Sequence, residues 1–289
     1  MPLRTRLGEA LFRLTAGPEG QRHRARIHGR PGPRWFDPES PIGMVHGDAS
    51  MYVGGLRALL LQTLHPAAMT GVSEHSDYRH DMLGRLARTS TFLAVTTFGH
   101  EDDAQQAVNA VRRIHERITG TLPDGTPYAA TDPHLLEWVH VAEIDSFLRA
   151  HQVYGRRPLD QAGRDEYVAQ TAVIARKLGI PAPPTTEAEL AERLESYRPE
   201  LASTHHAREA VRYVIRKPPL PIAARPAYLV LVAAAVGLLP RWTRTPLRLP
   251  DLPMSERTVV RALGTAATGT IRWVMSPGRA AAHELSDAR

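Results

Sequence analysis

Apolar residues recur at helical spacing along most of the chain, most clearly over residues 101–120. Acidic side chains open this stretch and Gly120 closes it, which suits the two ends of a helix. His115 lies four residues after Val111 and three before Ile118, so the helical period places its ring on the apolar side. The pattern therefore predicts an amphipathic helix that turns an imidazole toward the protein interior. Its apolar positions are Ala104, Ala107, Val108, Val111, Ile114 and Ile118.

Similar patterns cover the rest of the chain and predict an all-α fold of about eight or more helices, with no convincing strand. An apolar stretch after residue 44 stops at Pro66, and residues 121–133 are expected to form a loop. Asp132 and Pro133 match the N-cap and first position of the helix that follows. Further helices are expected over 78–99, 133–155, 160–180, the later part of 181–201, 203–216, 227–239 and 255–275.

The first part of the chain has a different composition. Residues 1–40 are rich in Arg, Gly and Pro, and "HGRPGPRWFDPESP" is typical of a loop or arm. The Pro-rich pieces at 181–184 and 217–226 are short, as helix connectors are, and do not indicate a domain boundary. We therefore expect an N-terminal arm over 1–40 and a single helical domain over 41–289.

Composition limits the chemistry that such a domain can carry. The 289 residues include no cysteine, which excludes disulfides, iron–sulfur clusters and thiolate-ligated haem, whereas 14 histidines leave metal ligands available. The motifs GxGxxG, GxxxxGKS/T, GxSxG and HExxH are absent, so no nucleotide, acyl-hydrolase or zincin function is indicated. The net charge of +6 comes without a zinc finger or an aromatic–basic platform, so nucleic acid is not an expected partner.

The sequence also predicts a cytoplasmic location. Residues 1–20 contain no long apolar segment and no small-residue cleavage site. The longest apolar run, residues 227–240, is too short for a membrane-spanning helix, which needs about 20 apolar residues. A buried core helix is the expected role of that run.

Histidines and arginines gather in four stretches between residues 64 and 147: "LHPAAMTGVSEHSD", "GRLARTS", "RRIHERITG" and "WVHVAEIDSF". A buried imidazole needs a hydrogen-bond partner or a metal, so His115 and His140 are either satisfied core residues or ligands. A neutral imidazole is the usual proximal ligand of a b-type haem, and nearby arginines suit the propionates. His140 and Glu143 lie one turn apart, so both can reach one non-haem iron, with His115 or His75 completing the set.

Two long stretches, "LHPAAMTGVSEHSDYRHDMLGRLARTSTF" and "VRRIHERITGTLPDGTPYAATDPHLLEWVHVAEIDSFL", resemble the MpaB-type oxygenase family, whose relatives include the rubber oxygenases, or latex-clearing proteins. The resemblance covers roughly residues 40–250 and rests on the combination of HP, HSD, GRLxRT, RxxH and DP…WVH. It implies an all-helical fold with a globin-reminiscent core and one non-covalent haem b. It also implies that His115 is the proximal iron ligand and that Arg112 lies beside the haem.

On the distal side of the haem, the rubber oxygenases carry an arginine followed by a lysine and a threonine. Arg85, Arg88 and Thr89 match these positions, so the resemblance implies that they shape the distal pocket and contact bound oxygen. The lysine can ligate iron, whereas the guanidinium of Arg88 keeps its proton and is a poor ligand. We therefore expect the sixth iron position to be open, or to hold water or one of His65, His75 and His140.

The resulting hypothesis is a haem b-dependent oxygenase that oxidises a small or medium apolar substrate with dioxygen or a peroxide, with an external electron donor where one is needed. The glutamate base of the rubber oxygenases has no clear match, so His75 or Glu74 is expected to substitute, and polyisoprene cleavage is not expected. Three alternatives fit the same residues: a haem-binding or haem-sensing protein without turnover, a non-haem iron enzyme using His140 and Glu143, and a structural domain that binds nothing.

Overall fold

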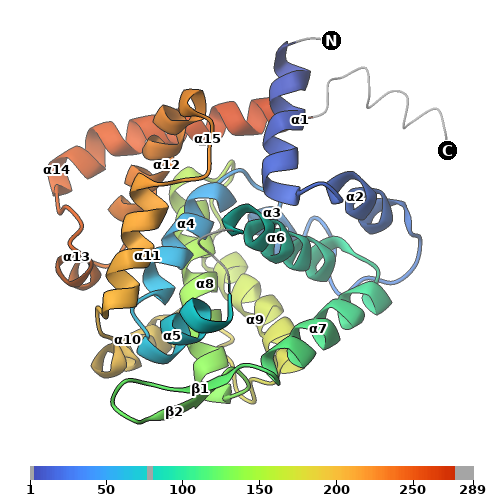
Figure 1. Ribbon diagram of the computed structural model, residues 1–289. Helices are drawn as coiled ribbons and strands as arrows, with labels where there is room; N and C mark the ends of the chain where they lie inside the picture. The colour runs from blue at the N-terminus through green and yellow to red at the C-terminus, as the bar shows by residue number, and fades with distance from the viewer. Residues whose placement is uncertain (1–2, 77–80, 277–289) are drawn as a thin grey trace.

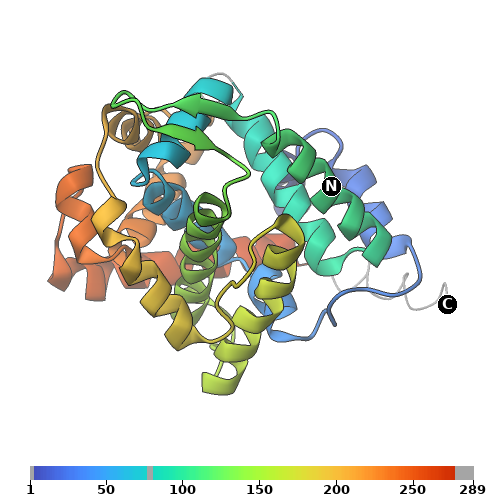
Figure 2. The ribbon, with the colours of Figure 1, turned by 90° about the horizontal axis from the view of Figure 1, so that it is seen from below.

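A computed structural model describes residues 3–76 and 81–276, and confirms the prediction of an all-α fold (Figure 1). One long helix, α8 (Pro133–Tyr154), runs through the middle and the other helices surround it (Figures 1 and 2). The surrounding helices are α1 (Leu3–Ala16), α2 (Gly20–Gly29), α3 (Pro41–His46), α4 (Met51–Gln62), α5 (Pro66–His75), α6 (Met82–Phe98), α7 (Glu101–His115), α9 (Gln161–Leu178), α10 (Glu187–Ser196), α11 (His205–Arg216), α12 (Arg225–Leu238), α13 (Arg241–Leu247), α14 (Pro253–Ser255) and α15 (Arg261–Met275).

The central helix begins where the sequence predicts. The Asp132 carboxylate accepts a hydrogen bond from the backbone N–H of His134, and Pro133 occupies the first helical position. Most of the side chains that follow are buried, and the indole of Trp138 has no exposed surface. α4 packs along the length of α8, and α12 packs in turn on α4. The apolar run predicted as a buried core helix therefore contributes one face to the core, whereas Leu229 and Ala233 are exposed.

A buried ion pair joins these three helices. The guanidinium of Arg57 on α4 lies 2.7 Å from the carboxylate of Asp145 on α8, and their side chains are 3% and 6% exposed. The same guanidinium donates hydrogen bonds to the Ser146 hydroxyl at 2.6 Å and to the Leu238 carbonyl at the end of α12 at 2.9 Å. Because both charges are removed from water, this pair holds α4, α8 and α12 in one geometry only while both partners are present.

The N-terminal region contains helices where the composition predicted an arm. α1 packs on α6 and α15, and α2 packs on α6, whereas residues 30–40 are non-helical as expected. The Gly and Pro residues that suggested an arm lie mainly at the ends of the helices, and Gly17 between α1 and α2 adopts a φ of +71°. The guanidiniums of Arg26 and Arg30 lie 2.6 and 2.7 Å from the Asp103 carboxylate, which joins α2 to α7.

A short antiparallel hairpin follows α7, so the helix predicted over 101–120 ends at His115 instead of Gly120, and the loop predicted over 121–133 contains a short strand. β1 (Thr119–Thr121) pairs with β2 (Pro127–Ala129), with Thr119 opposite Ala129. Gly125 in the turn has a φ of +89°, a conformation open to glycine at little cost. Strands of three residues are too short for an alternating pattern to appear in the sequence.

Two other helices are interrupted relative to the prediction. The apolar stretch after residue 44 divides into α3, α4 and α5, and α5 begins at Pro66 itself. The helix expected over 255–275 opens with a π-helical turn, η3 (Glu256–Val260), before α15. Residues 78–80 of the helix predicted over 78–99 lie outside the described residues. In the part of the chain that is described, no helix combines the length and the apolar character needed to cross a bilayer. The cytoplasmic location stays a prediction.

Candidate cofactor site

His115 is the last residue of α7 and lies on the side that faces the protein. Its ring is half-buried, and desolvation lowers the pKa of the imidazole, so the ring is neutral at physiological pH. No hydrogen-bond partner for this ring occurs among the described residues. A neutral imidazole with free nitrogens is available as a metal ligand.

The other side chains of this helical turn point outward. Ile114, predicted to face inward, is 57% exposed, because successive helical residues lie about 100° apart and His115 takes the inward direction. Arg112 is exposed, and no acidic side chain in the described ranges pairs with it. The end of α7 therefore offers one inward imidazole and one free guanidinium a turn earlier.

The hairpin brings the end of α7 close to the start of α8. β1 begins four residues after His115, β2 ends four residues before Pro133, and the Ala130 N–H donates to the Ile118 carbonyl at 2.9 Å. The hydroxyl of Tyr128 on β2 donates to the Glu74 carboxylate at 2.7 Å, which fixes α5 against the hairpin (Figure 1). The connection predicted as a loop between two candidate ligand helices is thus a hydrogen-bonded hairpin.

α8 carries the second group of candidate ligands, on the stripe that contains Phe147. His140 has a buried Nε2 with no hydrogen-bond partner, and burial lowers the pKa of its ring to about 4. Glu143, one turn later, is half-buried with no polar partner in the described part of the chain, and desolvation raises the pKa of its carboxyl to about 7. Buried polar atoms without partners are rare in proteins, so the Nε2 of His140 makes this ring a candidate ligand, and the Glu143 carboxyl lies one helical turn away.

The carboxyl of Glu143 is expected to make the stability of the metal-free protein depend on pH. Its pKa of about 7 in the folded chain lies above the ordinary value of 4.5, so the protonated carboxyl favours the folded state. This contribution to the free energy of unfolding is complete below about pH 4.5 and is lost as pH rises through 7. Between about pH 5 and pH 8 the loss should reach about 2–3 kcal/mol in the free energy of unfolding. Urea denaturation of the wild type and of Glu143→Gln at both pH values measures it.

Comparing the wild type with Glu143→Gln separates the effect of this carboxyl on stability from the effect of the nearby imidazoles. Burial lowers the pKa of His46 to about 3 and that of His140 to about 4, so protonation of the unfolded chain below pH 6.5 weakens the fold through these rings. Both proteins share that effect. If Glu143→Gln kept the same loss of stability between pH 5 and pH 8 as the wild type, the carboxyl would not hold a proton near neutrality.

His46, at the end of α3, extends this polar group and was not found from the sequence. Its Nδ1 lies 2.8 Å from the Thr97 hydroxyl on α6, and its Nε2 lies 3.3 Å from the Tyr167 hydroxyl on α9. The ring also meets Phe147 edge-on, at 5.5 Å between centroids. Burial raises the pKa of Tyr167 far above its usual value, and the charge of Glu143 adds to the shift. Side chains from α3, α6, α8 and α9 therefore converge on one region.

His65 lies elsewhere. Its ring is buried with neither nitrogen hydrogen-bonded, 5.9 Å from the ring of Trp138 and 6.5 Å from that of Tyr197. The nearest carboxylate is that of Glu200, at 3.9 Å. Trp138 precedes His140 by two residues, about 200° around the helix, so His65 and His140 contact different faces of α8. The fold therefore separates these two candidates for the sixth iron position.

The candidate distal residues lie on the first turns of α6. Arg85 is half-buried and donates to the Ser76 hydroxyl at 3.0 Å, while Thr89 is exposed. Arg88 is exposed and pairs with Asp81, the N-cap of α6, at 2.9 Å. This contact holds the Arg88 guanidinium at the protein surface. The roles of all three in an oxygen-binding pocket stay predictions.

The remaining candidates lie at the end of α5. His75 is exposed and Glu74 accepts the hydrogen bond from Tyr128, so neither is buried as a catalytic base usually is. The aspartate of the HSD motif, Asp77, lies outside the described residues. Their assignment as substitutes for the family glutamate also stays a prediction.

A further group of potential metal ligands lies on α11, and sequence reasoning missed it. Ligand atoms of His205, His206 and Glu209 lie within 4.8 Å of one another, in positions that are exposed or half-buried. The ring of His206 lies 3.2 Å from the Ser73 hydroxyl on α5. The spacing HHxxE was visible in the sequence, but the helical faces alone do not show which side chains converge.

The helical domain with unpartnered imidazoles on α7 and α8 matches a known class of oxidising enzymes. Residues 44–273 match the family described as "ER-bound oxygenase mpaB/B'/Rubber oxygenase, catalytic domain". Since the match covers most of the chain, this protein belongs to that family of oxygenase catalytic domains. The resemblance seen in the sequence is thereby confirmed. His115 and His140 both lie within the residues that match the oxygenase catalytic domain.

Two curated relatives are also similar to part of the chain. They are the uncharacterized protein Mb2261 of Mycobacterium bovis and the uncharacterized protein Rv2237 of Mycobacterium tuberculosis. Each is 30% identical over 129 residues, which cover 43% of this chain and 49% of the relative. The chain thus spans about half the length of the curated relatives it matches. No solved structure matches the chain.

Proposed function

We propose that this chain is a haem b-dependent oxygenase in which His115 is the axial ligand of the iron. The observation that carries the proposal is the neutral, unpartnered imidazole at the inward end of α7, within a family of oxygenase catalytic domains. Haem b would supply a redox-active iron that activates dioxygen or a peroxide. A small or medium apolar substrate and an external electron donor follow from the same family resemblance.

The residues present fit such a group. The exposed guanidinium of Arg112 is free to pair with a propionate by a charge-assisted hydrogen bond. The buried Nε2 of His140 lacks a partner, so it can turn to the cofactor or to a water beside it. The carboxyl of Glu143, with a pKa of about 7, can hold or release a proton near neutral pH, as a general acid or base requires.

An absorption spectrum of protein expressed with added haem tests this proposal, before and after reduction with dithionite and addition of carbon monoxide. A Soret band that moves with carbon monoxide is the expected result, because an oxygenase needs an exchangeable sixth position. A Soret band that carbon monoxide leaves unchanged would indicate a haem carrier or sensor. The absence of a Soret band would overturn the proposal.

A second candidate function is a non-haem iron enzyme, and the pair of unpartnered groups on α8 favours it. His140 and Glu143 are one helical turn apart, and an imidazole with a carboxylate is a common ligand set for non-haem iron. Metal analysis separates the two functions. Iron without porphyrin, lost in His140→Ala and kept in His115→Ala, would establish this candidate and reject the first.

A further inference from the structure

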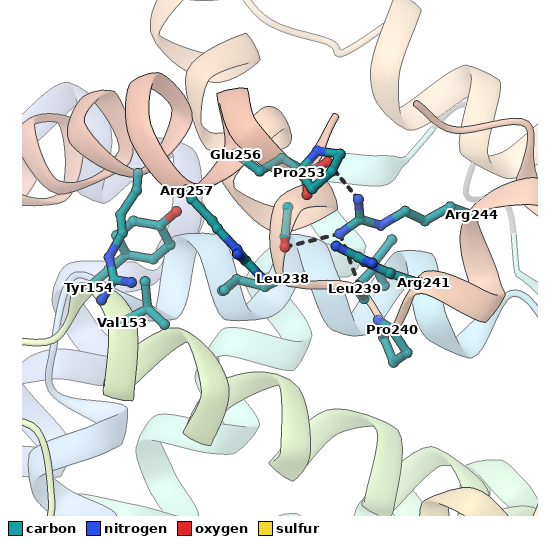
Figure 3. A pocket seen from close by; sticks show the side chains of 12 residues that line it. Val153, Tyr154, Leu238, Leu239, Pro240, Arg241, Arg244, Pro253, Glu256 and Arg257 are labelled. Atoms are coloured by element: carbon teal, nitrogen blue, oxygen red, sulfur yellow. Dashed lines mark hydrogen bonds and ion pairs between the residues drawn. The ribbon is translucent and has the colours of Figure 1, made fainter. Parts of the chain in front are cut away.

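A cleft lies at the C-terminal end of α8, whereas the hairpin after His115 leads to the N-terminal end of that helix. Its volume is about 390 Å³, and it is formed by the ends of α8 and α12, by α13, and by the segment from α14 to α15 (Figure 3). Val153 and Tyr154 line it on the side of α8, and Leu238 and Leu239 line it at the end of α12. None of the candidate cofactor residues contributes to it.

Three arginines line this cleft without a compensating charge. Arg241 on α13, Arg257 on η3 and Arg261 on α15 are exposed, and in the described ranges none of them has an acidic or hydrogen-bonding partner. Figure 3 shows Arg241 and Arg257 extending toward each other from opposite sides, across Leu238 and Leu239. Like charges that converge in this way repel one another unless an anion lies between them.

The two carboxylates nearest the cleft both pair with Arg244, so the four arginines there still exceed them by two positive charges. The buried guanidinium of Arg244 pairs with Asp251 at 2.9 Å. It also pairs with Glu256 at 2.5 Å and donates to the carbonyls of Gly237 and Leu239 (Figure 3). These contacts fix the end of α12 against η3. The three outer arginines therefore face the cleft as surplus positive charge on a fixed backbone.

Two local features add to this arrangement. The π-helical turn η3 carries Arg257 and leads directly to Arg261, and π-turns inside helices occur frequently at functional sites. The Tyr154 side chain is buried, its hydroxyl has no hydrogen-bond partner among the described residues, and burial raises its pKa while Arg261 opposes that shift. A neutral hydroxyl beside a guanidinium is a second kind of donor for an anion.

The segment that carries Arg257 and Arg261 also carries exposed apolar side chains. Leu252 and Met254 are 58% and 74% exposed, and Val259 and Leu263 are 59% and 49% exposed. All four belong to the same segment, from just before α14 to the first turn of α15. These apolar side chains are therefore close in the chain to two of the three cationic side chains of the cleft.

From this geometry we propose that the cleft binds the phosphate group of an anionic ligand, with Arg241, Arg257 and Arg261 as its cationic contacts and the Tyr154 hydroxyl as a further donor. A phosphate monoester carries close to two negative charges, so it balances the surplus guanidiniums better than a single carboxylate does. The phosphate belongs either to a lipid headgroup or to a soluble phosphate compound. The proposal does not depend on the cofactor of the proposed oxygenase.

Two binding measurements on the full chain test it. Calorimetric titration with inorganic phosphate reports a soluble anion, and co-sedimentation with phosphatidylcholine vesicles, with and without phosphatidic acid, reports a lipid headgroup. Arg241→Ala and Arg257→Ala should each weaken binding about tenfold, because each removes a charge-assisted hydrogen bond. Arg176→Ala on α9 is the matched control, because this arginine is exposed and does not line the cleft, and it should change binding less than twofold.

The outcomes separate the sources. Phosphate binding that the cleft variants weaken indicates a soluble ligand, and binding only to vesicles with phosphatidic acid, again weakened by the variants, indicates a lipid. If neither probe binds, or if Arg176→Ala reduces binding as much as the cleft variants do, the proposal is wrong. A Soret spectrum that the cleft variants leave unchanged shows that any loss of binding is separate from the oxygenase site.

Discussion

Replacement of His115 by alanine is expected to lower the affinity for haem b by well over tenfold. The imidazole supplies the bond from the protein to iron, and even residues that only support a metal ligand change affinity by roughly 10–100-fold. Titration of the apoprotein with haemin, followed at the Soret band, measures the change. Added imidazole should restore a six-coordinate or five-coordinate spectrum in the variant, because the free ring can occupy the vacated position.

His205→Ala is the matched control, since this histidine is exposed on α11 and belongs to the surface group of ligands. It should bind haem as the wild type does. His140→Ala should keep haem and change the response to carbon monoxide, because His140 is a proposed occupant of the sixth iron position or a neighbour of it. Equal haem affinity in His115→Ala and the wild type would show that another residue holds the iron.

Arg57→Ala should destabilise the protein by about 3–5 kcal/mol, because it leaves the buried Asp145 carboxylate with only the longer, half-exposed contact to Arg149 at 3.5 Å. The substitution also removes the donors to Ser146 and to the end of α12. A domain of ordinary stability has about 5–15 kcal/mol in total, so the variant should unfold at much lower urea concentration. Equilibrium denaturation followed by far-UV circular dichroism gives the free energy of unfolding.

Arg88→Ala is the control for the loss of an arginine as such. Its pair with Asp81 is exposed, with side chains 67% and 52% accessible, so the expected cost is at most about 1 kcal/mol. The double variant Arg57→Met with Asp145→Leu should recover much of the lost stability, because it buries no charge. Similar costs for Arg57→Ala and Arg88→Ala would contradict a structural role for the buried pair.

The two sites lie toward opposite ends of one helix. α8 has 22 residues, which is a length of about 33 Å at 1.5 Å per residue. His140 and Glu143 lie in its first half, and Tyr154, which lines the cationic cleft, is its last residue. Substitutions in the cleft should therefore leave the candidate ligands in place, so that the phosphate and haem experiments report on separate regions.

The sequence by itself determined the main helices and the leading candidate ligand. Asp132 and Pro133 fixed the start of α8 because an N-cap and a first-turn proline are local signals. The helical period identified His115 as inward-facing, and it put His140 and Glu143 on one stripe. The motifs around these residues also identified the family, which the match over residues 44–273 confirms.

Only the tertiary structure decided which side chains meet. His46 joins Thr97, Phe147 and Tyr167 from positions far apart in the chain, and no sequence spacing predicts such a contact. The same holds for the three arginines of the cleft. They lack acidic partners because the buried Arg244 already pairs with the nearby carboxylates of Asp251 and Glu256. Burial also sets protonation: a carboxyl such as Glu143 shifts its pKa through desolvation, which arises from packing by residues that the local sequence does not specify.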